Sequence, residues 1–354
     1  MTHPSGSSHK RVLITGGAGF IGSNLCIALA TRHPEWDVVA CDNLFRRGSE
    51  LNLPRLRTAG VSFVHGDVRQ ADDLTRIGPI DALVECSAEP SVMASVDGAT
   101  DYVVQTNLMG AYRCLELAAR HGAQLIFLST SRVYPVAALE AMPVVETDDR
   151  YELVDSDGVS EAFPLTGART LYGATKLAAE LLVAEFADTH GIPTVVNRCG
   201  VVAGPWQMGK VDQGVFTHWM LSHHRGDPLR YIGYGGTGKQ VRDLLHVDDL
   251  VELVELQLAD PAHWAGTTFN VGGGRAGSLS LRETTALCAR IAGREVPVTS
   301  AGETRPGDVR VYLSDCSALY AHTSWRPTRG PEQVLADIST WITANEALVL
   351  SALG

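Results

Sequence analysis

A glycine-rich turn near the start of the chain constrains its fold more than any other feature. The apolar run 12–15 predicts a buried β-strand, and Gly16-Gly17-Ala18-Gly19-Phe20-Ile21-Gly22 follows it and opens a predicted helix at 19–31. Glycines at such a turn let the backbone approach a pyrophosphate and direct the amino end of the helix at it. A GxGxxG match alone is weak, because a chain with 35 glycines can contain one by chance. The position between strand and helix makes this turn a predicted dinucleotide site, with candidate ligands Gly16, Gly19, Phe20, Ile21 and Gly22.

Short apolar runs alternate with helical patterns through the first half of the chain. Further strands are predicted at 37–41, 61–65, 82–86, 124–129 and 194–198, and further helices at 100–121 and 171–190. Several runs are apolar throughout, which is typical of parallel strands that helices cover on both faces. The predicted fold class is α/β, a Rossmann-type doubly wound parallel sheet with a smaller, interleaved C-terminal lobe.

The predicted organisation has three parts: a disordered polar head at 1–10, a sheet domain at 11–199 plus 240–272, and the smaller lobe at 200–239 plus 273–354. The segment 134–170 has no clear periodicity, and a loop of that length predicts a lid or a binding element. The predicted helix 171–190 has an apolar face that packs either on the sheet or on a second subunit. This face comprises Leu171, Ala174, Leu177, Ala178, Leu181, Leu182 and Phe186.

Composition excludes several classes of function. Of the 354 residues 45% are hydrophobic, which allows a large core. The net charge of −11 disfavours binding to nucleic acid or to an anionic membrane, so we expect a small-molecule partner. No run of about 18 apolar residues and no signal-peptide pattern occurs, which predicts a cytoplasmic protein. The seven cysteines include no Cys-x-x-Cys pair and are interpreted as reduced core residues.

Asp42 is a candidate for recognition of the cofactor ribose. It follows Gly22 by 20 residues, at the end of the second predicted strand. A carboxylate there can accept hydrogen bonds from the adenosine ribose, and it repels the 2′-phosphate of NADP. The alternative is that Asp42-Asn43 only begins a turn. With the glycine turn in place, the spacing favours NAD.

Tyr172 and Lys176 are candidates for acid–base chemistry. They are four positions apart on a predicted helix, so both side chains lie on one face and can reach one substrate hydroxyl. A nearby ammonium favours phenolate over phenol and lowers the tyrosine pKa towards that of a working general base. Thr130 follows another strand and could hydrogen-bond the reacting oxygen. Taken singly, the pair could be a surface pair and the Ser/Thr cluster a plain turn.

His246, Asp248 and Asp249 could suggest a metal or hydrolase site. They precede or begin a helical pattern at 247–258. Acidic residues are favoured at a helix start by the N-terminal dipole, so we interpret them as a helix start. No metal site is predicted.

In combination these elements resemble the extended short-chain dehydrogenase/reductases, in particular the nucleotide-sugar epimerase and dehydratase group, over most of the chain. In the family's order the sequence contains the turn 16–22, Asp42-Asn43, Gly66-Asp67-Val68, Ser87-Ala88-Glu89, Asn107 to Gly110, Ser129-Thr130 with Val133-Tyr134, and Tyr172 to Lys176. The resemblance implies that Thr130, Tyr172 and Lys176 are catalytic. It implies tightly bound NAD, with further contacts from Asp42, Asn43, Asp67, Val68, Ala88, Asn107, Lys176 and Cys199.

Within the group the sequence is most similar to epimerases that invert carbon 2 of a CDP-linked sugar. The similar stretches are 64–69, 212–214, 238–246, 278–281 and 305–315. This similarity implies a nucleoside-diphosphate sugar, CDP-linked, as substrate, a nucleotide-sugar role for the smaller lobe, and a homodimer or homotetramer. The implied substrate ligands are Glu89, Ser91, Thr130, Gln213, Arg242, Arg305 and Asp308, with the two arginines suited to phosphate oxygens.

The predicted activity is NAD-dependent epimerisation, by transient oxidation to a keto sugar and return of the hydride to the opposite face. Dehydration is disfavoured, because relatives that dehydrate carry Asp-Glu directly after the catalytic Thr, where this chain has Ser131-Arg132. The alternatives are a 4-epimerase, a ketoreductase or dehydrogenase of the same family, and a non-catalytic NAD-sensing Rossmann protein. An NAD sensor has no need of a general base, so the set Thr130, Tyr172 and Lys176 argues against it.

Overall fold

A seven-stranded parallel sheet forms the centre of the molecule. The computed structural model describes residues 9–94, 98–208 and 214–353. The strand order β12-β8-β5-β4-β1-β2-β3 confirms the predicted doubly wound sheet, and it reverses direction between β1 and β4, where such folds bind ligands. The strands are β1 (Arg11–Thr15), β2 (Asp37–Asp42), β3 (Ser62–His65), β4 (Ala82–Glu85), β5 (Gln124–Thr130), β8 (Thr194–Cys199) and β12 (Thr267–Val271).

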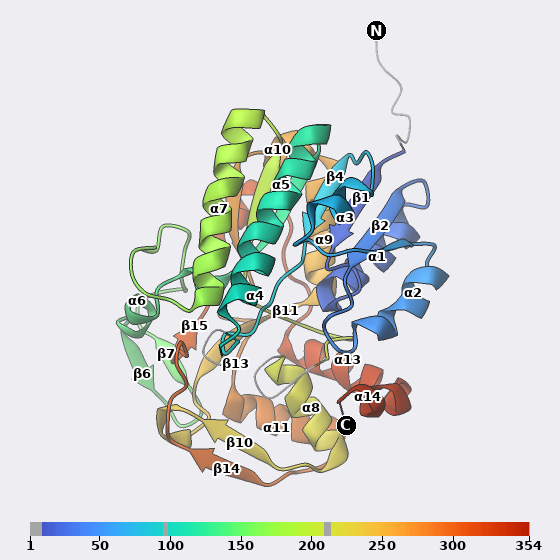
Figure 1. The fold of residues 1–354 in the computed structure, drawn as a ribbon. Helices are drawn as coiled ribbons and strands as arrows, with labels where there is room; N and C mark the ends of the chain where they lie inside the picture. The colour runs from blue at the N-terminus through green and yellow to red at the C-terminus, as the bar shows by residue number, and fades with distance from the viewer. Residues whose placement is uncertain (1–8, 95–97, 209–213, 354) are drawn as a thin grey trace.

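Helices cover both faces of this sheet. Along β1, Val12 and Ile14 pack into one core cluster and Leu13 into another, because successive side chains of a strand point to opposite faces. The first cluster includes side chains of α1 (Phe20–Arg32) and α9 (Val247–Ala259), and the second those of α5 (Gly110–His121) and α7 (Leu171–His190). In Figure 1, α5 and α7 run side by side in front of the sheet. Both faces of β1 are therefore dry, which explains its uninterrupted apolar sequence.

The second part of the molecule is built around a smaller sheet. Its strand β11 (Val241–His246) pairs with β9 (Val201–Ala203), β13 (Ser278–Ser280) and β15 (Val311–Tyr312), and not with the central sheet, although the predicted division placed 240–272 in the sheet domain. The chain then returns through α9 and β12 to the central sheet. The assignment of the two parts to cofactor and substrate stays a prediction.

The lower part of Figure 1 shows helices packed beneath the small sheet. Aromatic and aliphatic side chains of α8 (Val215–Arg225), α11 (Leu281–Ala292) and α13 (Pro331–Ala344) share one core there.

No helix of the described residues is long and apolar enough to cross a membrane. The remaining elements are α2 (Leu53–Thr58), α3 (Ala71–Thr75), α4 (Thr100–Val104), α6 (Val136–Glu140), α10 (Pro261–Trp264), α12 (Ser317–His322), α14 (Glu346–Leu353), the pairs β6 (Val144–Glu146) with β7 (Tyr151–Leu153) and β10 (Leu229–Ile232) with β14 (Val298–Ala301), and short turns at Ser49–Asn52, Gln105–Met109, Ser131–Val133 and Tyr234–Gly236.

The face of α7 that packs on the sheet differs from the predicted apolar face. The helix buries Thr175, Lys176, Ala179, Glu180 and Val183, while Leu181 is 68% exposed. Buried partners on the strands satisfy the polar members of this face: for example, Glu180 accepts hydrogen bonds from Ser129 and pairs with Arg198. Leu182 and Phe186 of the predicted apolar face pack against the same core, so that face covers the sheet only in part. A count of apolar residues does not detect the polar partners.

The segment 134–170 carries short elements that the sequence pattern did not predict. It contains α6 and the antiparallel pair β6–β7, and it is anchored to the second part of the molecule. The backbone N–H of Val159 donates to Leu313, and Tyr151 donates to Lys239. None of its described residues lines the cavity discussed below, so the predicted role as a lid or binding element stays a prediction.

Candidate active site

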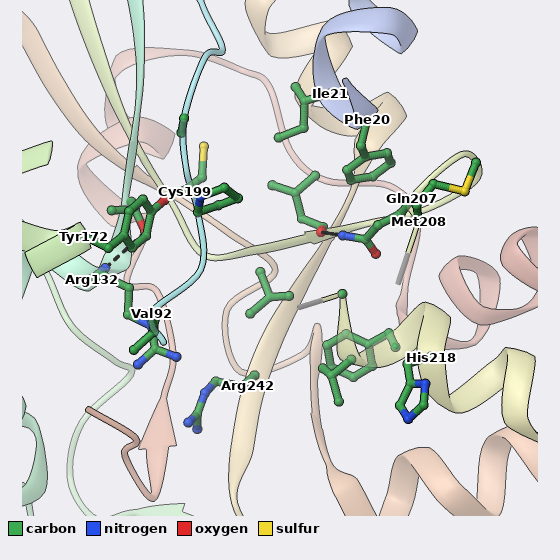
Figure 2. Close-up of a pocket in the computed structure, with 18 of the residues that line it drawn as sticks. Phe20, Ile21, Val92, Arg132, Tyr172, Cys199, Gln207, Met208, His218 and Arg242 are labelled. Atoms are coloured by element: carbon green, nitrogen blue, oxygen red, sulfur yellow. Dashed lines mark hydrogen bonds between the residues drawn. The ribbon is translucent and has the colours of Figure 1, made fainter. Parts of the chain in front are cut away.

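A cavity of about 680 Å³ opens at the carboxyl ends of the central strands. Residues that follow or end β1, β4, β5 and β8 form one wall, and residues of α8, β11 and the segment 305–308 form the other. Figure 2 shows Phe20 and Ile21 on one side, Tyr172 and Cys199 on another, and Arg242 below them. The predicted residues on the wall are Gly16, Gly19, Phe20, Ile21, Gly22, Ala88, Thr130, Tyr172, Lys176, Cys199, Arg242, Arg305 and Asp308.

The glycine turn has the geometry that a dinucleotide requires. Gly16 has φ +63°, in the left-handed region that favours glycine. A Cβ at Gly22 would lie 2.2 Å from the Gly16 carbonyl oxygen, so the turn closes tightly over the start of α1. No side chain caps α1 at Gly19, which leaves the first N–H groups of the helix available to phosphate oxygens. The turn therefore fits the pyrophosphate of NAD.

Asp42 lies at the end of β2 and holds this turn in place. Its carboxylate accepts hydrogen bonds from the backbone N–H of Ala18 at 3.1 Å and of Leu44 at 2.8 Å. Burial raises the pKa of Asp42, and these backbone hydrogen bonds oppose the rise. Asp42 itself is not on the cavity wall. Its carboxylate can accept more than these two bonds, and the predicted contact with the ribose stays a prediction.

The other predicted cofactor ligands off the wall form a supporting shell. Asp67 accepts hydrogen bonds from Arg69 and, at 3.0 Å, from Asn43; burial acts to raise the pKa of Asp67, but these bonds lower it to about 2. Val68 is buried in the core beneath Gly110. The predicted contacts of these residues with NAD stay predictions.

Asn107 fixes the loop that follows β4. It lies in the π-helical turn 105–109, a local departure from α-helix that is frequent at functional sites. Its side chain accepts from the backbone N–H of Glu89 at 2.8 Å and donates to the Glu89 carbonyl at 3.1 Å. Glu89 in turn accepts from the N–H of Ser91. Glu89 and Ser91 do not line the cavity, and Gln213 lies outside the described residues.

Tyr172 and Lys176 lie in the first turns of α7, as predicted, and face the cavity together with Thr130. Thr170 caps the helix through the N–H of Gly173, so the helix start and the phenol have a fixed position. Burial raises the pKa of Tyr172; the charge of Lys176 and a hydrogen bond with Thr130 lower it, but by less. The ammonium thus acts on the phenol pKa in the predicted direction, and burial of the phenol outweighs it.

Glu85 is a functional candidate that the sequence pattern missed. It ends β4 and accepts a hydrogen bond from Lys176 Nζ at 3.1 Å, with both side chains 2% exposed. The same ammonium lies 4.1 Å from the centre of the Phe127 ring. Burial raises the pKa of Glu85, and Lys176 opposes this. A detectable signal was present, because Glu85 is the one charged residue in the apolar run 82–86.

The wall opposite the glycine turn carries cations and a large apolar surface. Arg242 pairs with Asp308 at 2.5 Å, and Arg305 lines the cavity beside them. The apolar surface was not predicted; it comes from segments that are far apart in the sequence and suits a flat nucleobase. It comprises Val202, Trp206, Phe216, Trp219, Leu229 and Leu279.

Two remaining sequence features receive a structural explanation. Cys199 lines the cavity, but burial raises the pKa of its thiol to about 12, so it is a neutral contact and not a thiolate nucleophile. His246 caps α9 by accepting from the N–H of Asp248 at 3.0 Å, which is the predicted helix start.

The fold, the glycine turn and the cavity together define a dinucleotide-binding protein of the Rossmann type. Residues 12–272 match the NAD dependent epimerase/dehydratase family, and the chain belongs to that family. This confirms the predicted family and its cofactor, NAD.

Several known proteins are similar over nearly their whole length. CDP-paratose 2-epimerase of Salmonella typhi is 30% identical, over 94% of this chain and 99% of its own. A dTDP-glucose 4,6-dehydratase of Mycobacterium tuberculosis is 29% identical over 95% and 94%. The structure of UDP-glucose 4-epimerase of Thermus thermophilus in complex with NAD superposes with a TM-score of 0.78 at 27% identity, over 94% of this chain and 99% of that one.

Proposed function

We propose that this protein is an NAD-dependent epimerase of a nucleoside-diphosphate sugar, acting through a keto sugar, and that carbon 2 of a CDP-linked sugar is the inverted centre. The observation that carries the proposal is the meeting of Thr130, Tyr172 and Lys176 with the glycine turn and Arg242 around one cavity. The similarity to CDP-paratose 2-epimerase supports the CDP linkage and the choice of carbon 2.

Each residue has a defined task in this reaction. Bound NAD would take the hydride from a sugar carbon and give it back to the opposite face. Tyr172, as phenolate, takes the proton of the hydroxyl on that carbon and returns it at the end. No net oxidation occurs, because the hydride would return to the same carbon. Thr130 hydrogen-bonds the oxygen, and the charge of Lys176 stabilises the phenolate. Arg242 and Arg305 hold the pyrophosphate while the sugar ring turns over.

The residues after Thr130 favour epimerisation over dehydration. A dehydratase needs an acid and a base to remove water after oxidation, and dehydratases of this family are expected to carry Asp-Glu at these positions. This chain has Ser131 and Arg132, and the latter lines the cavity as a cation. Neither side chain replaces a carboxylate pair.

The outward face of α7 supports a homodimer or homotetramer. Leu181 is 68% exposed on that helix, an apolar group that a second subunit could cover. The mass of the NAD-loaded protein in solution, measured by sedimentation, checks this part of the proposal; a monomer at micromolar concentration contradicts it.

A turnover assay in deuterium oxide tests the reaction itself. The protein is incubated with CDP-, UDP-, dTDP- and GDP-linked sugars without added cofactor, and the products are analysed by NMR. We expect an inverted sugar that carries no deuterium at the new centre, because the hydrogen moves only between the sugar and the cofactor. Stoichiometric deuterium there would mean deprotonation beside a carbonyl and would exclude the hydride mechanism. A requirement for added NADH or NADPH in each turnover would indicate a reductase.

A further inference from the structure

Arg132 is a cation near the reacting end of the cavity to which the sequence pattern gave no task. Its backbone N–H donates to the Thr130 hydroxyl oxygen at 3.2 Å, and its Nη1 donates to the Gly307 carbonyl at 2.8 Å. The side chain therefore reaches from the end of β5 to the segment 305–308 in the other wall. In Figure 2 it extends from beside Tyr172 towards Arg242.

The backbone of Arg132 is locked against the helix that carries Tyr172. A Cβ at Gly173 would lie 2.0 Å from the Arg132 carbonyl oxygen, so only glycine permits this approach. Because Gly173 directly follows Tyr172, the backbone at Arg132 lies against the backbone that carries Tyr172.

The guanidinium of Arg132 has more hydrogen-bond donors than acceptors among the described residues. Arg242 already pairs with Asp308, whereas among the described residues the Arg132 guanidinium donates only to a neutral carbonyl. Burial and the neighbouring charge of Arg242 lower the pKa of Arg132, the nearby carboxylate of Asp308 opposes this, and a guanidinium stays charged in proteins. Five N–H donors with one protein acceptor make a strong site for phosphate oxygens.

We propose that Arg132 determines which carbon reacts, by holding the β-phosphate of the substrate close to Tyr172. This inference rests on the proposed function. In a nucleoside-diphosphate sugar the anomeric carbon bears the β-phosphate, carbon 2 is bonded to that carbon, and carbon 4 lies across the ring. A phosphate held beside Tyr172 brings carbon 2 to the phenol. A phosphate held only by Arg242 and Arg305, farther along the wall, would leave room for carbon 4.

Binding measurements separate a phosphate contact from a structural role. Calorimetry with the NAD-loaded protein compares CDP with CMP, and UDP with UMP, for wild type, Arg132→Met, Arg132→Lys and the control Arg120→Met. Arg120 is exposed on α5, far from the cavity residues. We expect Arg132→Met to weaken the diphosphates at least about tenfold, the scale of one charge-assisted hydrogen bond, and the monophosphates little. Arg132→Lys should recover part of the loss. Equal losses for both members of each pair would overturn the proposal.

The source of the hydride tests the choice of carbon. Wild type and Arg132→Met are mixed with CDP-sugars deuterated at carbon 2 or at carbon 4, and deuterium in the bound reduced cofactor is measured by mass spectrometry. We expect label only from carbon 2 in wild type and a larger share from carbon 4 in Arg132→Met.

Label from carbon 4 in wild type would overturn the role of Arg132, but it would still agree with the proposed epimerase activity. No transfer from any nucleotide sugar would remove the proposed function and this inference with it. A third outcome is that Arg132→Met only stops discriminating between nucleotide sugars that are neutral in the sugar and those that carry a sugar carboxylate. Arg132 would then bind the sugar, and its proposed contact with the phosphate would be wrong.

Discussion

The two ends of the cavity are built from different parts of the chain. At the cofactor end, a continuous stretch of seven residues, 16–22, supplies backbone N–H groups and close contacts between glycines. At the end proposed for the nucleotide sugar, Arg132, Arg242 and Asp308 come from separate segments and contribute side chains to the wall. A site made of backbone demands glycine at fixed spacing, while a site made of side chains demands only that the fold bring them together. We therefore expect the first end to tolerate fewer substitutions than the second.

Tyr172 lies between the two ends, and its removal should have the largest effect. Tyr172→Phe is expected to lower turnover by at least about a hundredfold, the usual scale for a general base, while both ends still bind their ligands. Turnover, the amount of NAD that copurifies and the affinity for CDP are measured together. Tyr112→Phe is the control, because its hydroxyl contacts only Glu116 among the described residues. Near-normal turnover of Tyr172→Phe would remove Tyr172 from the mechanism.

Gly22→Ala should break the cofactor end alone. The new Cβ would lie 2.2 Å from the Gly16 carbonyl oxygen, a backbone atom that cannot rotate away as a flexible side chain could. Overpacking of this kind costs about 1–3 kcal/mol, which corresponds to roughly a fivefold to hundredfold loss of bound NAD. NAD content and thermal unfolding are the measurements. Gly330→Ala is a matched control, because a Cβ at Gly330 meets nothing within 4 Å. Full NAD content in Gly22→Ala would show that the turn is not the pyrophosphate site.

The contrast between the two ends also explains what could be predicted from the sequence. The glycine turn, the strands and α7 were predicted because backbone geometry and burial on both faces leave local patterns, and α7 has the predicted bounds Leu171–His190. Thr130, Tyr172 and Lys176 do meet at one cavity. Their spacing on one helix and their position after a strand were visible in the chain.

The features that the sequence did not reveal depend on contacts between distant segments. The buried face of α7 contains Lys176 and Glu180; the partner of Lys176, Glu85, is 91 residues away, and the partner of Glu180, Arg198, is on the strand that follows α7. The apolar wall at Trp206 and Phe216 is assembled in the same way. No periodicity encodes such pairs, so the apolar pattern did not show that polar residues of α7 are buried.

Arg242→Met should break the nucleotide-sugar end alone. Its loss removes one guanidinium from the predicted pyrophosphate site and leaves Asp308 without its partner, which adds repulsion of the substrate phosphates. We expect KM to rise about tenfold, with copurified NAD unchanged. Steady-state kinetics with the best substrate of the panel measure KM. A loss of NAD with no change in KM would reverse the assignment of the two ends.

The smallest expected effect is a shift of the pH profile in Glu85→Gln. This variant tests whether the carboxylate that pairs with Lys176 also affects the pKa of Tyr172. Burial raises the pKa of Tyr172 and Lys176 opposes this, so kcat/KM should rise with pH as the phenolate forms. Glu85 is negative and pairs with Lys176 at 3.1 Å; its carboxylate therefore reduces the net positive charge that the phenol feels. Glutamine removes that charge and keeps an acceptor for Nζ. The pKa of Tyr172 should fall, and the rising limb of the kcat/KM profile should move to lower pH by less than about one unit, a differential interaction of about 1.4 kcal/mol at most.

A shift to higher pH would instead show that Glu85 acts by holding Lys176 in place, because a displaced ammonium stabilises the phenolate less. An unchanged profile would mean that the pair Glu85 and Lys176 only stabilises the fold, which unfolding measurements on the same variant would reveal.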